Sequence, residues 1–183
     1  MNKNLQLLLR ELEKTRETYW NITPEVGQFL NDFIRKHNYK TVLEIGTSNG
    51  YSGLWLAEAL SHNGGTLYTI ESNAKKRFPL GQATFAASGL TNIKQILGHA
   101  PEAIPTEPEN FDLAFFDATK HEHLEYFQAI SQRIRPGGAI ITDNIDSHRK
   151  ELESYIQSVQ DTPGWTSSEN PLGTGLLISI KTG

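Results

Sequence analysis

The sequence predicts an α/β fold, in which a doubly wound and mostly parallel sheet carries helices on both faces. Short apolar runs rich in β-branched and aromatic residues alternate with longer helical patterns along the whole chain. These runs are continuously apolar, as is typical of strands covered on both faces. The last two β runs are bracketed by Pro163-Gly164 and by Pro171-Leu172-Gly173. They are therefore expected to form an antiparallel hairpin at the C-terminal edge of the sheet.

Two helices are expected before the first strand. Residues 3–18 should form one amphipathic helix, because leucines recur at i, i+3, i+4 and i+7. These leucines are Leu5, Leu8, Leu9 and Leu12. The second helix should begin after Thr23 as its N-cap, with Pro24 in the first turn. Its buried face is expected to carry Val26, Phe29, Leu30 and Phe33.

Five strands are expected in the parallel part of the sheet. They are Thr41–Ile45, Thr66–Ile70, Ile93–Leu97, Phe111–Phe116 and Ala139–Thr142. A helix around His121–Ile134 should separate the last two and end before Pro136. Another helix should cover Ser147–Gln160, and the hairpin then ends in the run Gly175–Lys181.

Length and composition restrict the classes of function. A chain of 183 residues favours one domain over 1–183, of which 1–22 would be an N-terminal helical extension. Seventeen Lys and Arg against 21 Asp and Glu give a net charge of −4, which argues against a dedicated nucleic-acid binder. The absence of cysteine excludes disulfides, thiolate metal sites and a cysteine nucleophile, and favours the cytoplasm. No apolar run approaches the length of a signal peptide or a membrane span, so no membrane partner is expected.

A glycine-rich turn follows the first strand, in the segment VLEIGTSNGYSG over residues 42–53. Such a turn lets the backbone approach a ligand at the start of a helix. The spacing G-x-x-x-G-x-x-G differs from the dinucleotide fingerprint G-x-G-x-x-G. The five residues around Ser48 match the hydrolase elbow G-x-S-x-G, with Asp117 or Asp143 and then His148 in hydrolase order. No strand precedes Thr41, however, as that fold requires. A site for S-adenosylmethionine (SAM) is the third reading.

Glu71 ends the second strand, about 20 residues after the turn, the offset at which an acid binds ribose hydroxyls in dinucleotide folds. A second reading is that Glu71 is only a favourable negative charge at the start of the next helix. The residue alone supports both readings equally.

Two further strands end in carboxylates at the edge where open α/β sheets bind ligands. Asp117 follows the fourth strand, and Asp143-Asn144 follows the fifth. If these strands are neighbours, the two carboxylates and the amide oxygen could bind Mg²⁺, Mn²⁺ or Ca²⁺, although solvated turn residues would also fit this spacing. Lys120 is close enough to Asp117 to act there as a general base, or it is a surface lysine at a helix start.

Several separated motifs, in the same order, make the chain resemble the cation-dependent O-methyltransferases, which include the catechol and caffeoyl-coenzyme A enzymes and bacterial relatives. The resemblance extends from about Thr23 to Lys181. Its carriers are TPEVGQFL from Thr23, LEIGTSNGYSGLWLAEAL from Leu43, YTIE from Tyr68, FDLAFFDATK from Phe111, RPGGAIITDN from Arg135 and PLGTGLLISIK from Pro171.

The resemblance implies a Rossmann-like fold and assigns roles to residues. Lys120 and Asp117 would be catalytic, with Lys120 as the base, and the metal ligands would be Asp117, Asp143 and Asn144. Ser52 would bind the cofactor carboxylate, Glu71 the ribose, and the segment 98–100 would lie beside the adenine. The full implied SAM site is Glu44, Gly46, Thr47, Ser48, Gly50, Tyr51, Ser52, Glu71, Gly98, His99, Ala100, Asp117 and Ala118. Two positions depart from the family pattern: His99 stands where relatives usually have an acidic or other polar residue, and Thr174 stands where an acid is often found.

The sequence therefore predicts an enzyme that transfers the methyl group of SAM to a hydroxyl of a small acceptor, expected to be an aromatic vicinal diol, with the help of a divalent cation. One alternative is a SAM-binding protein without transferase activity. Another is a tRNA hydroxyuridine O-methyltransferase, whose RNA contacts would be Arg35, Lys36, Lys40 and the run 75–77. A remote alternative is a serine hydrolase that uses Ser48. The leucine stripe of the first helix would either form a homodimer surface or pack on its own domain.

Overall fold

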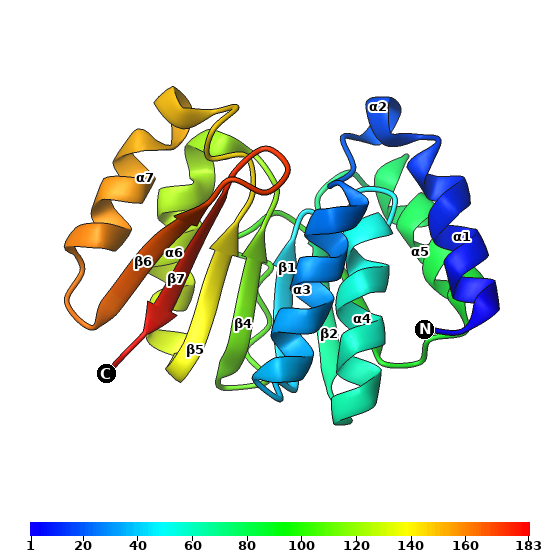
Figure 1. Ribbon diagram of the computed structural model, residues 1–183, viewed down its shortest axis with the longest axis horizontal. Coiled ribbons are helices and arrows are strands. Elements are labelled where there is room, and N and C mark those ends of the chain that lie inside the picture. Colours follow the sequence, from blue (N-terminus) through cyan, green and yellow to red (C-terminus); the bar gives the residue numbers. More distant parts are fainter.

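The computed structural model describes residues 1–183 and contains one seven-stranded sheet between two layers of helices (Figure 1). The spatial order of the strands is β3-β2-β1-β4-β5-β7-β6. The first five strands in this order run parallel, and β7 and β6 are antiparallel. The strands are β1 (Thr41–Ile45), β2 (Thr66–Glu71), β3 (Ile93–Leu97), β4 (Phe111–Phe116), β5 (Ile134–Thr142), β6 (Trp165–Asn170) and β7 (Leu176–Lys181). The predicted fold class, including the C-terminal hairpin, is confirmed.

The strand order reverses beside β1, and this reversal positions the site. The chain runs outward from β1 through β2 to β3 and then returns to place β4 on the other side of β1. Ile45 pairs with Phe116, and Phe116 pairs with Thr142, so three successive strands end in register. The residues after these strands consequently meet at one edge, where open α/β sheets hold their ligands.

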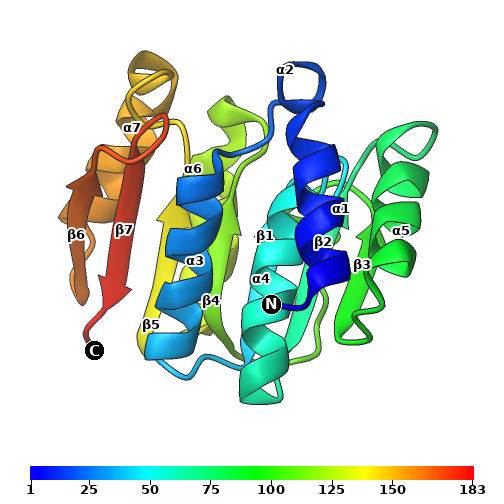
Figure 2. The same cartoon turned by 45° about the vertical axis from the view of Figure 1, so that its right-hand side comes forward.

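The helices divide between the two faces of the sheet. Helices α3, α4 and α5 cover one face with α1 packed outside them, and α6 and α7 cover the other (Figures 1 and 2). The helices are α1 (Lys3–Glu13), α2 (Arg16–Tyr19), α3 (Pro24–Lys36), α4 (Tyr51–Asn63), α5 (Arg77–Ser88), α6 (His123–Ile130) and α7 (Arg149–Asp161), with short 3₁₀ turns at Lys120–Glu122 and Ser131–Arg133. None of the helices is long and apolar enough to cross a bilayer.

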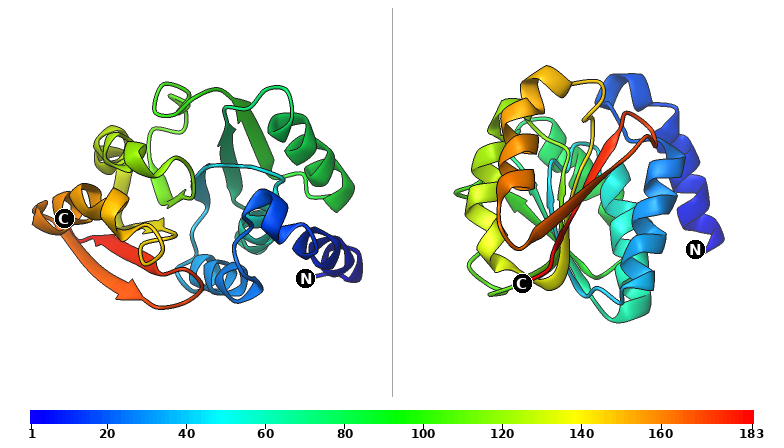
Figure 3. Two further views of the ribbon diagram at one scale, coloured as in Figure 1. Left: turned by 90° about the horizontal axis from the view of Figure 1, so that it is seen from above. Right: turned by 60° about the vertical axis from the view of Figure 1, so that its left-hand side comes forward.

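Two apolar clusters form the core, one on each face of the sheet. Alternate residues of β1 point to opposite faces, so Val42 joins one cluster while Leu43 and Ile45 join the other. The view from above in Figure 3 shows the helices on both sides of the twisted sheet. Because both faces are covered, the loops at the carboxyl edge are left to form a binding site.

The N-terminal segment differs from the single helix predicted over residues 3–18. The helix ends at Glu13, and the Thr15 hydroxyl donates a 2.6 Å hydrogen bond to the Leu12 carbonyl. The separate turn α2 follows and ends at Trp20, whose φ of 55° is left-handed. The leucine stripe packs on this chain's own core through Leu5 and Leu9, which are buried. The break redirects residues 16–23 over the edge of the sheet.

Two smaller differences concern the ends and faces of elements. The helix predicted over 121–134 is shorter, because α6 ends at Ile130 and β5 already begins at Ile134. β5 accommodates the segment Pro136-Gly137-Gly138 beside a register shift between Phe111 and Leu113. On α3, Thr23 caps the helix as predicted, but Phe29 and Phe33 are only half-buried.

Candidate functional site

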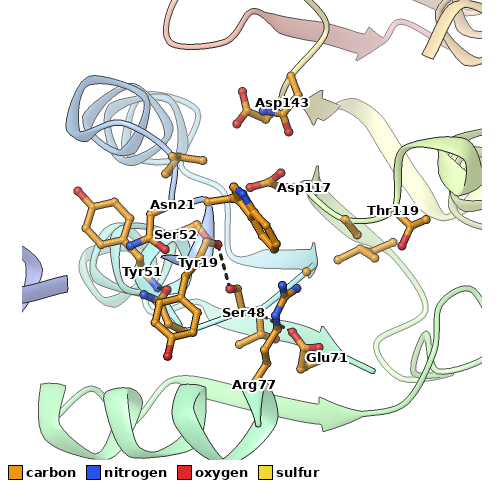
Figure 4. Close-up of a pocket in the computed structure, with 18 of the residues that line it drawn as sticks. Tyr19, Asn21, Ser48, Tyr51, Ser52, Glu71, Arg77, Asp117, Thr119 and Asp143 are labelled. Atoms are coloured by element: carbon orange, nitrogen blue, oxygen red, sulfur yellow. Dashed lines mark hydrogen bonds between the residues drawn. The ribbon is translucent and has the colours of Figure 1, made fainter. Parts of the chain in front are cut away.

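A cavity of about 570 Å³ opens at the carboxyl edge of the parallel strands. Its volume lies within the range of small-molecule and cofactor pockets. Figure 4 shows Ser48, Glu71 and Arg77 on one side, Asp117 and Asp143 on another, and Tyr19 and Asn21 of the N-terminal segment on a third. Its walls come from residues 16–17, 19–23, 45–49, 51–52, 70–72, 98–100, 117–120, 143–144, 147–148 and 173–174, with Val26, Arg77 and Tyr126 in addition.

The glycine turn after β1 forms the floor of the cavity. Gly46 has a φ of 109°, and a Cβ there would collide with the Asp117 carbonyl oxygen, so only glycine fits. The backbone N–H groups of Gly46 and Thr47 both donate to the Ile70 carbonyl at 3.1 Å, which ties the turn to the end of β2. Thr47, Ser48, Tyr51 and Ser52 also line the cavity.

Ser48 has a left-handed backbone with φ 51°, as a nucleophile would in a hydrolase elbow. Its hydroxyl, however, donates to the Tyr19 carbonyl at 3.3 Å, and no histidine or aspartate hydrogen-bonds to it. The structure therefore does not assemble the triad that the hydrolase alternative needs.

Glu44 and Gly50, two residues of the predicted SAM site, do not line the cavity. Glu44 is fully buried beneath the turn and accepts hydrogen bonds from Ser52 Oγ at 2.5 Å and Thr69 Oγ1 at 2.6 Å. This burial raises the pKa of the Glu44 carboxyl to about 7. Gly50 faces Phe85 of α5, whose ring would lie 3.0 Å from an added Cβ. Glu44 thus supports the turn from below, and Gly50 packs the turn against α5.

Glu71 connects the end of β2 to the glycine turn. Its Oε2 accepts a hydrogen bond from the Ser48 backbone N–H and its Oε1 one from the Asn73 N–H, both at 2.8 Å. The side chain is almost fully buried but lines the cavity. The structure holds this carboxylate in one orientation, with its remaining acceptor capacity available for a pair of hydroxyls.

Asp117, Asp143 and Asn144 come together at the ends of β4 and β5, as their positions in the sequence predict. The Asp143 N–H donates to the Phe116 carbonyl at 3.1 Å, so the two segments are adjacent. Asp143 is 3% exposed, and its pKa is raised to about 7 by burial and by the negative charge of Asp117. Lys120 Nζ donates to Asp117 Oδ1 at 3.0 Å.

The remaining predicted residues, Gly98, His99, Ala100 and Ala118, also line the cavity. The Gly98 N–H donates to the Glu71 carbonyl at 3.0 Å, which places segment 98–100 beside the end of β2. His99 Nε2 is 3.2 Å from Glu122 Oε2. His148, for which the sequence indicated no role beyond the hydrolase reading, lines the cavity as well.

Sequence reasoning missed the N-terminal segment as a wall of the cavity. Trp20 is 72% exposed, and the Arg77 guanidinium lies 5.2 Å from its ring centroid. Lys76 lies over the ring of Tyr19 at 5.8 Å. The one clue to this wall in the sequence was the adjacent aromatic pair Tyr19 and Trp20, which lies between two predicted helices.

Comparisons with known proteins give a consistent result. A family model described as O-methyltransferase matches residues 2–161. A catechol O-methyltransferase from Niastella koreensis is 36% identical over 138 residues, which cover 73% of this chain and 62% of that relative. This chain thus spans less than two thirds of that relative's length.

Solved structures share the fold. The O-methyltransferase from Bacillus cereus in complex with SAH has a TM-score of 0.86 at 23% identity, with 100% of this chain and 92% of that chain covered. The O-methyltransferase TomG from Streptomyces achromogenes in complex with SAM has a TM-score of 0.83 at 24% identity, with 100% and 91% covered.

Proposed function

This chain belongs to the O-methyltransferase family, and from that membership we propose that it transfers the methyl group of SAM to a hydroxyl of a small acceptor carrying two adjacent oxygens, with a divalent cation at the strand-end carboxylates. One observation carries the proposal. A single cavity brings the glycine turn and Glu71 together with Asp117, Lys120, Asp143 and Asn144. The solved relatives that hold SAM or SAH share this fold.

The turn and Glu71 would hold the cofactor, which supplies the methyl group. The carboxylate of Glu71 is fixed by two backbone N–H groups and suits the paired hydroxyls of a ribose. Ser52 Oγ donates to Glu44, so toward a ligand it offers only acceptor capacity in this arrangement. In this proposal the backbone of the turn, more than the Ser52 hydroxyl, binds the methionine end of the cofactor.

The donor set at the ends of β4 and β5 fits a hard divalent cation. Asp143 and Asp117 are adjacent carboxylates whose mutual repulsion contributes to the raised pKa of Asp143, and a cation between them would relieve that repulsion. No group of three or more His, Cys, Asp or Glu side chains in the structure is placed to hold a metal ion, so the third protein ligand would be the amide oxygen of Asn144. A cation held there supplies positive charge that lowers the pKa of an acceptor hydroxyl.

Lys120 would take the proton from the acceptor hydroxyl. Lys120 lines the cavity together with the proposed cation ligands. In the structure it donates to Asp117 at 3.0 Å, so Asp117 orients the side chain. To act as a base, Lys120 must first lose a proton, and positive charge beside it favours that loss.

The test is methyl transfer from radiolabelled SAM to catechol and hydroxycinnamoyl acceptors, with metal-stripped protein and added Mg²⁺ or Mn²⁺. We expect turnover that requires the added cation. Asp143→Ala should lower kcat/KM by about 100-fold or more, since it removes a buried ligand. Asp161→Ala, an exposed aspartate at the end of α7, is the matched control and should retain full activity.

Two results would contradict the proposal. Equal turnover with chelator and with Mg²⁺ would show that the reaction does not need a cation. Binding of SAH without turnover of any acceptor would favour the SAM-binding protein without transferase activity.

A further inference from the structure

The loop between β6 and β7 reaches the proposed cation site through one side chain, that of Thr174. Its Oγ1 lies 2.9 Å from Asp143 Oδ1 and 2.8 Å from Asn144 Nδ2. Thr174 also lines the cavity. It is the one side chain in the structure that hydrogen-bonds to both residues, although it is 31 and 30 residues away from them in the sequence.

The chemistry of a hydroxyl fixes the direction of both hydrogen bonds. A hydroxyl has one proton, and an ionised carboxylate, the form that binds a cation, only accepts, so Thr174 donates to Asp143. Toward Asn144 the same oxygen can then only accept, and the amide must present its NH₂ group. A flipped amide would place its oxygen against a lone pair of the hydroxyl. The bond from Asn144 to Thr174 thus directs the amide oxygen of Asn144 away from the loop.

The backbone of the same loop is held independently of this side chain. The Thr174 carbonyl accepts from the Asp146 N–H at 3.0 Å, and the Gly175 carbonyl accepts from the Ile145 N–H at 3.1 Å. Gly175 has a φ of 87°, and an added Cβ would lie 2.5 Å from the Asp146 carboxyl carbon. The loop therefore stays in place when only the hydroxyl of Thr174 is removed.

We propose that Thr174 is a positioning residue that presents the amide oxygen of Asn144, rather than its NH₂ group, to the divalent cation. The inference rests on the cation site proposed above. It adds to that proposal that coordination of the cation by the amide oxygen of Asn144 depends on a residue that does not itself bind the cation. Groups that orient ligands in this way commonly change metal affinity by about 10- to 100-fold.

The experiment is a titration of metal-stripped protein with Mn²⁺, in which electron paramagnetic resonance measures the free ion. Thr174→Val keeps the shape of the side chain but removes the hydroxyl, and we expect its Kd to rise about 10-fold or more. Thr174→Ser restores the hydroxyl and should bind within about twofold of wild type. Thr166→Val, on the exposed side of β6, controls for the substitution itself. Circular dichroism checks that each variant is folded.

A second readout needs no metal. The side-chain NH₂ resonances of Asn144, observed by NMR in metal-free protein, should shift and exchange faster in Thr174→Val and remain near wild type in Thr174→Ser. Unchanged Asn144 resonances in Thr174→Val would overturn the inference directly.

The outcomes separate this inference from the proposed function. If Asp143→Ala abolishes Mn²⁺ binding while Thr174→Val binds as wild type does, the cation site stands and the role of Thr174 is wrong. If wild-type protein binds no Mn²⁺, both the cation site and the role of Thr174 fail. If Thr174→Ser binds as weakly as Thr174→Val, packing rather than the hydroxyl is responsible, and the inference is again overturned.

Discussion

At the scale of single residues, buried polar groups in this protein serve to hold backbone segments in place around the cavity. Glu71 fixes the glycine turn, Glu44 supports it from beneath, and His123 holds the turn that carries Lys120 by bonding to the Thr119 carbonyl at 3.0 Å. Motif position predicted which strand-end residues meet. It could not distinguish Glu71 from Glu44, because only the fold decides which carboxylate faces the cavity and which lies beneath the turn.

Glu71→Gln is predicted to weaken the binding of SAH by roughly 10- to 100-fold. The amide loses the charge, and its NH₂ group faces a backbone N–H that now has no acceptor. Hydrogen bonds to charged groups contribute about 1.5–3 kcal/mol, and about 1.4 kcal/mol corresponds to a tenfold change in Kd. Isothermal titration calorimetry with SAH measures the change. Glu153→Gln, on the exposed face of α7, should bind as wild type does, whereas normal affinity in Glu71→Gln would exclude a role in ribose binding.

His123 is predicted to make the stability of the protein depend on pH. Burial and the charge of Lys120 lower its pKa to about 3, so the folded state keeps the imidazole neutral. In the unfolded chain the histidine has a pKa of about 6.5 and binds a proton that the folded chain does not, so stability falls as the pH drops from about 6.5 toward 3. Between pH 7 and 5 this group should account for a loss of about 2 kcal/mol.

Urea denaturation of His123→Phe at both pH values tests this expectation. The ring can still pack against Phe116, Tyr126 and Tyr155. Its loss of stability between pH 7 and 5 should be smaller than that of wild type by about 2 kcal/mol. His121→Phe changes an exposed imidazole and should keep the wild-type pH dependence. The same pH dependence in all three proteins would contradict the assignment to His123.

At the scale of elements, the site depends on how strands end and on how turns connect them. Strand positions were predictable because strands covered by helices on both faces of the sheet are continuously apolar. The break of the helix at Thr15 was not predictable, because the leucine stripe continues the helical period up to Leu12 and only tertiary contacts stabilise the break. Those contacts run from Asn49 to Thr15 and from Tyr51 to Glu13, each at 3.2 Å.

Gly46→Ala is predicted to disrupt the junction between β1 and β4. The added methyl meets the Asp117 carbonyl oxygen at a φ of 109°, so the turn or the end of β4 must move. We expect a loss of stability of about 3 kcal/mol or more, together with loss of SAH binding. Gly89→Ala is the control, because Gly89 also has a positive φ of 72° but has nothing within 4 Å of an added Cβ. It should cost only about 1–2 kcal/mol and leave binding intact, and equal thermal shifts in the two variants would refute the argument from the close contact.

At the scale of the whole molecule, the cavity has a rigid base and a weakly attached cover. The base consists of strand ends in register. The cover is residues 16–23, of which only Ile22 is buried. It is held by the 3.3 Å bond from Ser48 to the Tyr19 carbonyl, the 3.0 Å bond from Asn21 to the Leu12 carbonyl and the two cation–π contacts from Lys76 and Arg77. The sequence predicts the base from strand patterns, but the cover requires knowledge of where the first helix packs. A segment with so few buried contacts is expected to open locally.

Bound SAH is therefore predicted to protect the N-terminal segment from trypsin. Cleavage after Lys14 or Arg16 requires the cover to open. Before the cover can open, a ligand enclosed beneath residues 16–23 must leave or lose its contacts with the cover. A ligand at 100 times its Kd stabilises the closed state by about 2.7 kcal/mol if it binds only that state, so cleavage there should slow by about tenfold or more. Mass spectrometry of timed digests identifies the sites.

Cleavage after Lys36, at the far end of α3, should not change, because that site does not contact the cavity. Equal protection at both places would show that SAH acts through global stability, and no protection at Arg16 would show that the N-terminal segment does not close over the cofactor.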